Sequence, residues 1–212
     1  MQGTVLYIMD PLCGWCYGFS NVMQQFEEKY KDTYDFQVIP GGMITGERVA
    51  PVSEMANYIL GAYKRVEDTA GVTFGEPYLD LLRAGTEISN SEPPCRAMHT
   101  FREMHPEKII DFTHELQLAI FRDGKSCNDN NTYKELATSF GLNGDEFVAA
   151  MNTEEIKYGT QQDFQWVQGA GISGFPCLVI QLEGKYYMIA QGYKPLEAIE
   201  EVLQNVNKSL KE

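Results

Sequence analysis

Two cysteines, Cys13 and Cys16, are separated by Gly14 and Trp15 in the segment DPLCGWCYGF. Thiols at this spacing can form a disulfide with each other, supply half of a zinc site, or fill a core. An apolar run, residues 4–9, precedes the pair, and an amphipathic run follows it. This position, after a strand and at the start of a helix, favours redox chemistry over the other two interpretations.

The two thiols are expected to have different roles. Cys13 lies at or just before the first helical turn, where free amide groups and the helix dipole stabilise a thiolate. A thiol in such a setting has a pKa lowered from about 8.5 to roughly 3.5–7.5, and the thiolate is the nucleophile. Cys16 lies one turn later, on the face expected to be buried. We therefore predict that Cys13 attacks and Cys16 resolves, while Gly14 leaves the first sulfur accessible and Trp15 shields one side.

A second signal comes from the segment GISGFPCLVI, residues 171–180. It places Phe175 and Pro176 at the start of a strand, the one position where a central strand tolerates proline. Because this strand is expected next to the cysteine pair, we predict a cis peptide bond before Pro176. Phe175 would then lie close to the pair.

The elements that must position these residues form two patterns. Residues 4–9 and 34–40 are apolar strands on either side of a helix, a βαβ unit. The chain ends with two strands, within 176–191, and a helix after Pro195, a ββα unit. Together they predict an α/β fold with one mixed four-stranded sheet, in the order 2-1-3-4, and helices on both faces.

The middle of the chain is expected to be an all-helical insertion. We place the sheet domain at residues 1–45 and 170–212 and the inserted subdomain at residues 46–169. One helix of the insertion carries an apolar stripe of Met55, Tyr58, Ile59, Ala62 and Val66. Two later helices carry capping signatures, Thr132 with Glu135 and Asn143 with Glu146.

Composition excludes several classes of protein. The chain has 212 residues, 43% of them hydrophobic, which suffices for a sizeable core. A net charge of −13 argues against binding to nucleic acid or to an anionic membrane surface. There is no apolar run of about 18 residues to span a bilayer. The first ten residues do not resemble a signal peptide, so we expect a cytoplasmic protein. Composition does not distinguish a monomer from a homodimer.

The remaining cysteines and the histidines give weaker signals. An odd number of cysteines, five, does not indicate a framework of structural disulfides. Cys127 stands in a polar loop and is predicted to be a surface thiol without a role, and Cys177 is predicted to fill the core. No histidine or cysteine lies at ligand spacing from another outside the CxxC, so we predict no metal site. A zinc-binding or structural protein remains an alternative.

The CGWC after a strand, the GISGFP before the third strand and the long helical insertion resemble the DsbA-like branch of thioredoxin-fold proteins. The sequence is most similar to the cytoplasmic FrnE-like proteins, relatives of 2-hydroxychromene-2-carboxylate isomerase and kappa-class glutathione transferases. The resemblance implies a thioredoxin-like fold and a thiol-disulfide oxidoreductase. It also implies that Phe175 and Pro176 hold the substrate backbone near Cys13, and that Asn90 and Cys95 face the substrate. A capping turn around a thiol without a redox role is the alternative for the last two.

Departures from the family pattern qualify these expectations. Gly14 stands where FrnE-like proteins often have proline, and Trp15 where DsbA has a histidine that stabilises the thiolate. We therefore expect a weaker oxidant than DsbA. The isomerase and transferase relatives typically have serine at the Cys13 position, so two thiols favour redox chemistry. A glutathione-dependent isomerase or transferase remains the alternative. Substrates are expected to be protein or small-molecule thiols and disulfides, with no cofactor except glutathione as a candidate thiol partner.

Overall fold

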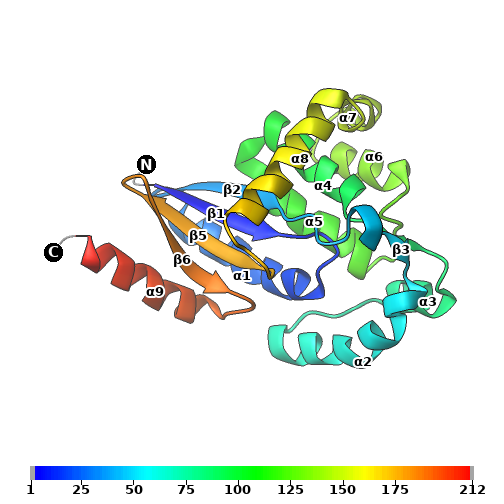
Figure 1. Cartoon of the computed structure of the whole chain (residues 1–212), viewed down its shortest axis with the longest axis horizontal. Coiled ribbons are helices and arrows are strands. Elements are labelled where there is room, and N and C mark those ends of the chain that lie inside the picture. The colour runs from blue at the N-terminus through cyan, green and yellow to red at the C-terminus, as the bar shows by residue number, and fades with distance from the viewer. Residues whose placement is uncertain (1–2, 211–212) are drawn as a thin grey trace.

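A computed structural model describes residues 3–210 of the chain. Its main sheet has four strands, β1 (Thr4–Met9), β2 (Asp35–Pro40), β5 (Cys177–Leu182) and β6 (Lys185–Gln191). Their order is β2-β1-β5-β6; β1 is parallel to β2 and antiparallel to β5, which is antiparallel to β6 (Figure 1). This is the mixed sheet that the βαβ and ββα patterns predict.

Both faces of this sheet are covered, which explains why β1 is an unbroken apolar run. The odd-numbered residues of β1 join a large core with α1 (Gly14–Tyr30) and α9 (Leu196–Ser209). The even-numbered residues, Leu6 and Ile8, join a smaller cluster with the end of α8 (Glu154–Gly169) on the opposite face. Side chains of one strand alternate between the faces, so β1 anchors two cores at once.

The chain between β2 and β5 is mainly helical. Its helices are α2 (Ser53–Ala70), α3 (Glu76–Ala84), α4 (Glu92–Met104), α5 (Ile109–Phe121), α6 (Asn130–Ser139), α7 (Gly144–Met151) and α8, with short 3-10 turns η1 (Gly46–Arg48) and η2 (Pro106–Lys108). One departure from an all-helical insertion is a two-stranded antiparallel sheet of β3 (Ala50–Pro51) and β4 (Ile88–Ser89). Figure 1 shows these helices beside one end of the main sheet, with α8 running back across it. No helix within residues 3–210 has the length and apolar character needed to cross a bilayer.

The apolar stripe predicted for α2 is only partly buried. Val66 packs in the core, but Met55 is 49% exposed and Tyr58 is 70% exposed. The helix carries the predicted apolar stripe, but the fold leaves these two positions of it exposed. Periodicity identifies an apolar face, but it does not tell what covers that face.

The two capping predictions have different outcomes. Asn143 caps α7 as predicted, because its side-chain oxygen accepts hydrogen bonds from the amides of Asp145 and Glu146. The cap of α6 is Asp129 instead of Thr132. The Asp129 carboxylate accepts a hydrogen bond from the Asn131 amide. The Thr132 hydroxyl donates instead to the Ser126 carbonyl, which closes the preceding turn.

Candidate active site

The cysteine pair lies where β1 passes into α1. Cys13 is the N-cap residue of α1, with extended backbone angles (φ −87°, ψ 112°), and Cys16 is on the first helical turn. Both are free thiols. Cys16 is completely buried, and it is close enough to Cys13 for each thiol to affect the pKa of the other. These positions agree with the sequence prediction for both residues.

The surroundings separate the pKa values of the two thiols. Hydrogen bonding from the Cys16 thiol lowers the pKa of Cys13, and the backbone amides of Cys16 and Trp15 lower it further. Burial and the charge of Asp10 oppose this effect. Complete burial raises the pKa of Cys16 well above the usual range, and the neighbouring Cys13 raises it further. Cys13 is therefore the thiol that ionises first, and Cys16 keeps its proton.

The loop before β5 faces this pair. The Phe175–Pro176 peptide bond is cis, as the sequence predicts. The Cys13 Sγ lies 3.7 Å from the Phe175 carbonyl oxygen. A Cβ atom at Gly41 would overlap the Phe175 ring, so the glycine after β2 lets this ring lie over the strand end. Cys177 points into the smaller core cluster, which confirms that it fills the core.

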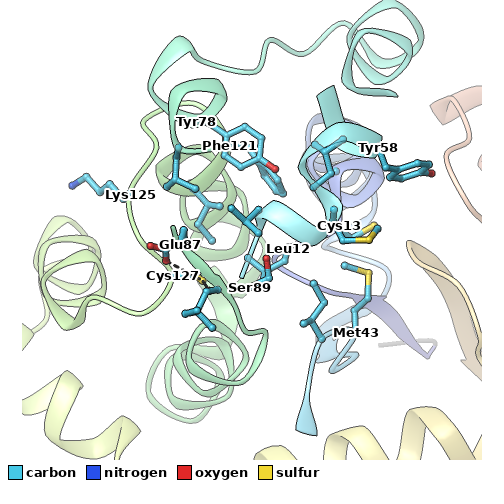
Figure 2. A pocket seen from close by; sticks show the side chains of 18 residues that line it. Leu12, Cys13, Met43, Tyr58, Tyr78, Glu87, Ser89, Phe121, Lys125 and Cys127 are labelled. Atoms are coloured by element: carbon cyan, nitrogen blue, oxygen red, sulfur yellow. Dashed lines mark hydrogen bonds between the residues drawn. The ribbon is translucent and has the colours of Figure 1, made fainter. Parts of the chain in front are cut away.

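Cys13 is only 8% exposed, but it lies on the walls of two cavities. The first, which we call the apolar cavity, has a volume of about 270 Å³ and separates the Cys13 segment from α2, α3 and α5. Its lining residues include Leu12, Cys13, Met55, Tyr58, Ile59, Tyr78 and Phe121, with Glu87, Ser89 and Lys125 as polar members. Figure 2 shows Cys13 on one side of this space and Glu87 and Cys127 on the opposite side.

The second space, which we call the polar cavity, has a volume of about 510 Å³ and lies between the ends of β2, α8 and the loop before β5. Polar side chains from η1, α8 and that loop line it, namely Thr45, Arg48, Gln161, Gln165, Gln168 and Ser173. Among the described residues that line it, none is acidic. Cys13 thus lies where an apolar and a polar, cationic environment meet.

Asp10 lies beneath the pair and was not identified from the sequence. It is completely buried, and its carboxylate accepts hydrogen bonds from the Leu12 amide (2.9 Å), the Met43 amide (2.6 Å) and the Ser91 hydroxyl (2.9 Å). These partners come from the loop after β1, the loop after β2 and the start of α4. Burial raises the pKa of Asp10, and these hydrogen bonds oppose the rise. The signal in the sequence was a single acid directly after an apolar strand.

Comparison with known proteins agrees with this geometry. The model of the DSBA-like thioredoxin domain matches residues 4–204. The chain belongs to this family. It is a family of DsbA-like thiol-disulfide oxidoreductases. No curated protein matches the sequence.

Solved structures resemble this DsbA-like chain over its whole length. A candidate protein disulfide isomerase from Nitrosomonas europaea is 28% identical, with a TM-score of 0.86 and 99% of both chains covered. The cytosolic disulfide reductase DsbM from Pseudomonas aeruginosa is 24% identical, with a TM-score of 0.80 and coverage of 96% of this chain and 98% of DsbM; a structure of DsbM with GSH is also similar. A 2-hydroxychromene-2-carboxylate isomerase is 11% identical, with a TM-score of 0.69 and 98% of each chain covered. The similarities to DsbM and to the isomerase, both below 25% identity, concern the fold alone.

The other predicted site residues of the DsbA-like chain differ in whether they line a cavity together with Cys13. Gly14 lines the apolar cavity and Phe175 the polar cavity, each together with Cys13. Trp15 lies on the wall of a smaller adjoining cavity, where its ring packs against Tyr193 at 6.2 Å between centroids.

Asn90 and Cys95 line neither cavity that contains Cys13. The Asn90 side chain accepts a hydrogen bond from the Glu92 amide at the start of α4. Cys95 is completely buried, and its sulfur lies 3.9 Å from Asp10 Oδ2. Burial and the charge of Asp10 raise the pKa of Cys95 well above its usual range, so this thiol is protonated beneath the active site.

Cys127 corrects a sequence prediction. It is buried, not on the surface, and its thiol lies 3.8 Å from a Glu87 carboxylate oxygen and 3.7 Å from the Ile88 carbonyl. The polar loop around it is held against β4, which the local sequence does not indicate. Burial raises the pKa of Cys127 to about 12, so the thiol is neutral.

Proposed function

We propose that the Cys13–Cys16 pair of this chain exchanges disulfides with protein or small-molecule substrates. The observation that carries the proposal is the N-cap position of Cys13, with a lowered pKa, on the walls of two cavities. A thiolate in this position can attack a disulfide that either cavity admits. The buried neighbour, Cys16, is protected from substrate and from other thiols until a mixed disulfide has formed.

The proposed exchange has two steps. The Cys13 thiolate attacks one substrate sulfur, a mixed disulfide forms, and the other half of the substrate leaves as a thiolate. Cys16 then loses its proton and attacks the Cys13 sulfur, which releases the second half and closes the Cys13–Cys16 disulfide. The substrate gains two electrons and the pair loses two. A substrate dithiol attacking the oxidised pair runs the same steps in reverse.

Substrate contacts are assigned to Gly14, Phe175 and Pro176, which lie beside the Cys13 sulfur. The carbonyl of Phe175 is directed at that sulfur and is therefore placed to accept a hydrogen bond from a bound substrate amide. Trp15 is assigned the rim of the site. For Asn90 and Cys95 a supporting role beneath the site agrees better with their burial and hydrogen bonds than direct contact with substrate.

The test is insulin reduction by dithiothreitol in the presence of the protein. We expect turnover to fall to the uncatalysed rate in Cys13→Ser, and Cys16→Ser to accumulate a mixed disulfide at Cys13 that mass spectrometry detects. Cys177→Ala, which removes a thiol from the core cluster, is the matched control and should keep its turnover. Turnover that is unchanged in Cys13→Ser would refute the proposal.

Glutathione is the second candidate, as a thiol partner or as the cosubstrate of an isomerase or transferase. The polar cavity supports it, because Arg48 and three glutamines match a small peptide with carboxylates. The DsbM structure that contains GSH adds support from a protein of similar fold. Calorimetry with reduced glutathione should give binding that Arg48→Gln weakens. An isomerase would keep its activity in Cys16→Ser, whereas an oxidoreductase would lose turnover.

We also propose the FrnE-like branch of the family and a cytoplasmic location. Similarity to the cytosolic reductase DsbM and to the isomerase fold supports the branch. Three further cysteines that are buried and unpaired agree with a reducing compartment. The redox state of the pair in extracts from intact cells, trapped with acid and an alkylating agent, tests the location: a mainly reduced pair is expected.

A further inference from the structure

The two cavities that share Cys13 differ in chemistry, and this difference bears on the substrate. In disulfide exchange, the attacking, central and leaving sulfurs lie close to one line. A disulfide that reacts with Cys13 therefore extends in two directions from the reacting sulfur. Two cavities that both have Cys13 on their walls provide separate places for its two halves.

Part of the wall of the apolar cavity consists of apolar side chains that the fold leaves exposed. Met55 and Tyr58, from the apolar stripe of α2, remain 49% and 70% exposed although Val66 on the same helix is in the core. Ile59, from the same stripe, also lines the space. An apolar surface beside a reactive sulfur gains free energy when an apolar ligand covers it. About 270 Å³ is room for an alkyl or aryl group, not for a folded partner.

The far end of the apolar cavity does not favour an anion. The Glu87 carboxylate lies there and accepts hydrogen bonds from Ser126 Oγ (2.6 Å) and Asn128 Nδ2 (2.9 Å). Lys125 also lines the cavity, but its ammonium group pairs with the Glu135 carboxylate. A carboxylate on the ligand would therefore be repelled at this end.

The polar cavity has the opposite character. Arg48 donates one hydrogen bond to the Gly42 carbonyl at 3.1 Å, and a guanidinium has five N–H groups, so donors remain for a carboxylate. No acidic residue is found among its described lining residues, in a chain of net charge −13. An anionic group is accepted here and rejected from the apolar cavity.

We propose that the substrate is an unsymmetrical low-molecular-weight disulfide, with an apolar half in the apolar cavity and a polar, anionic half in the polar cavity. This deepens the proposed function and rests on it. The Cys13 thiolate attacks the sulfur of the polar half, beside the Phe175 carbonyl. A disulfide bond forms between Cys13 Sγ and that sulfur. The substrate S–S bond breaks, and the apolar half leaves as a thiolate that takes a proton from water. Cys16, once deprotonated, attacks the Cys13 sulfur, which breaks the mixed disulfide, releases the polar half as a thiolate and closes the Cys13–Cys16 disulfide. The substrate gains two electrons and the pair loses two.

The test measures single-turnover rates of the reduced protein with mixed disulfides of glutathione and alkanethiols from methyl to hexyl. Each rate is divided by the rate of the same disulfide with a free small thiol, which removes differences in intrinsic reactivity. We expect the normalised rate to rise by as much as about fourfold per methylene, from the transfer free energy of a buried methylene, until the cavity is full. In Cys16→Ser the trapped adduct on Cys13 should be glutathionyl, and an alkyl adduct would overturn the assignment of the halves.

A matched pair of variants locates the effect. Met55→Gln should reduce the hexyl-to-methyl rate ratio several-fold, because it places an amide on the wall of the apolar cavity. Met104→Gln changes an exposed methionine on α4 that lines neither cavity, and should leave the ratio unchanged.

The outcomes separate this inference from the function on which it rests. If no disulfide in the series, including glutathione disulfide, reacts faster with the protein than with the free small thiol, the oxidoreductase proposal fails. If glutathione disulfide reacts but the alkyl series is flat, only the present inference fails. A glutathionylated peptide with a leucine beside its cysteine that reacts faster than the hexyl disulfide would assign the apolar cavity to a peptide side chain and overturn the small-molecule assignment.

Discussion

At the scale of single residues, Asp10 connects the cysteine pair to the helical insertion. Its neighbours Leu12, Met43 and Ser91 all donate hydrogen bonds, which is the arrangement expected around an ionised carboxylate. Its charge raises the pKa of both Cys13 and Cys16. Asp10 therefore holds three segments in place and moderates the acidity of the nucleophile.

Replacing this carboxylate tests both roles. Asp10→Asn removes the charge and leaves one acceptor oxygen for donors that use two. We expect the Cys13 pKa to fall further, measured as the midpoint of the alkylation rate against pH. We also expect the free energy of unfolding to fall by about 1–3 kcal/mol, since a buried amide donor is left without its acceptor. Asp68→Asn, at an exposed position on α2, is the control. A midpoint that stays the same or rises would contradict a charged Asp10.

At the scale of elements, the approach of α1 to α2 shapes the site. Gly18 is buried on α1, and a Cβ atom there would lie 2.9 Å from the Ala70 Cβ and 3.0 Å from Val66 Cγ1 on α2. The absence of a side chain therefore lets the two helices pack closely. Since α2 also forms a wall of the apolar cavity, this contact fixes the distance across that cavity.

Two glycine-to-alanine changes should have opposite effects on stability. Gly18→Ala gains helix propensity of about 1 kcal/mol but overpacks the α1–α2 contact, for an expected net loss of roughly 1–2 kcal/mol. Gly61→Ala, on α2, places its Cβ where no atom lies within 4 Å, so only the gain of about 0.5–1 kcal/mol remains. Urea unfolding of both reduced proteins measures the difference. Equal stabilisation by both changes would show that the helices can separate at no cost.

At the scale of the whole molecule, the features that the sequence predicts are those determined by residues that lie close together along the chain. The βαβ and ββα patterns are local signals from which the sheet order was predicted, and Pro176 at a strand start beside the cysteine pair predicted the cis peptide bond. The environment of Asp10 depends on residues up to 81 positions away along the chain, so no local pattern carries it. Cys127 was assigned to the surface because its neighbours are polar, although β4 covers it.

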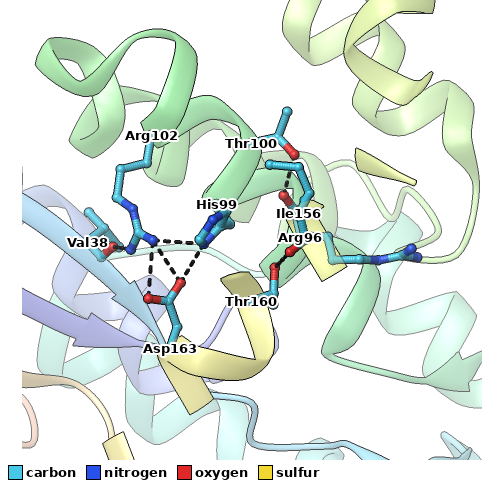
Figure 3. Close-up of polar contacts among 8 residues, drawn as sticks. All are labelled: Val38, Arg96, His99, Thr100, Arg102, Ile156, Thr160 and Asp163. Carbon is cyan, nitrogen blue, oxygen red and sulfur yellow. Dashed lines mark hydrogen bonds and ion pairs between the residues drawn. The ribbon is translucent and has the colours of Figure 1, made fainter. Parts of the chain in front are cut away.

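The contact between the insertion and the sheet through Arg102, Val38 and Asp163, which we call the joint, is another feature without a local signal. Arg102 on α4 donates to the Val38 carbonyl on β2 (2.8 Å) and to the Asp163 carboxylate on α8 (2.9 Å), which also contacts His99 Nδ1 (Figure 3). The charged side chains of Arg102 and Asp163 are only 15% and 13% exposed. Three elements thus share one poorly solvated ion pair. Because α8 supplies three glutamines of the polar cavity, this joint also positions one half of the proposed substrate site.

Breaking the joint should weaken both stability and binding. Asp163→Asn leaves the Arg102 guanidinium buried without a counter-charge, at an expected loss of about 3 kcal/mol in the free energy of unfolding. Asp80→Asn removes one carboxylate partner of Arg83 on the exposed side of α3, where an ion pair contributes about 0–1 kcal/mol, and serves as the control. Urea unfolding gives the stabilities, and calorimetry with glutathione gives the affinity for the polar cavity. If Asp163→Asn lowers stability but leaves the affinity equal to that of Asp80→Asn, α8 is held over the polar cavity by its apolar contacts alone, and the ion pair has no part in positioning the site.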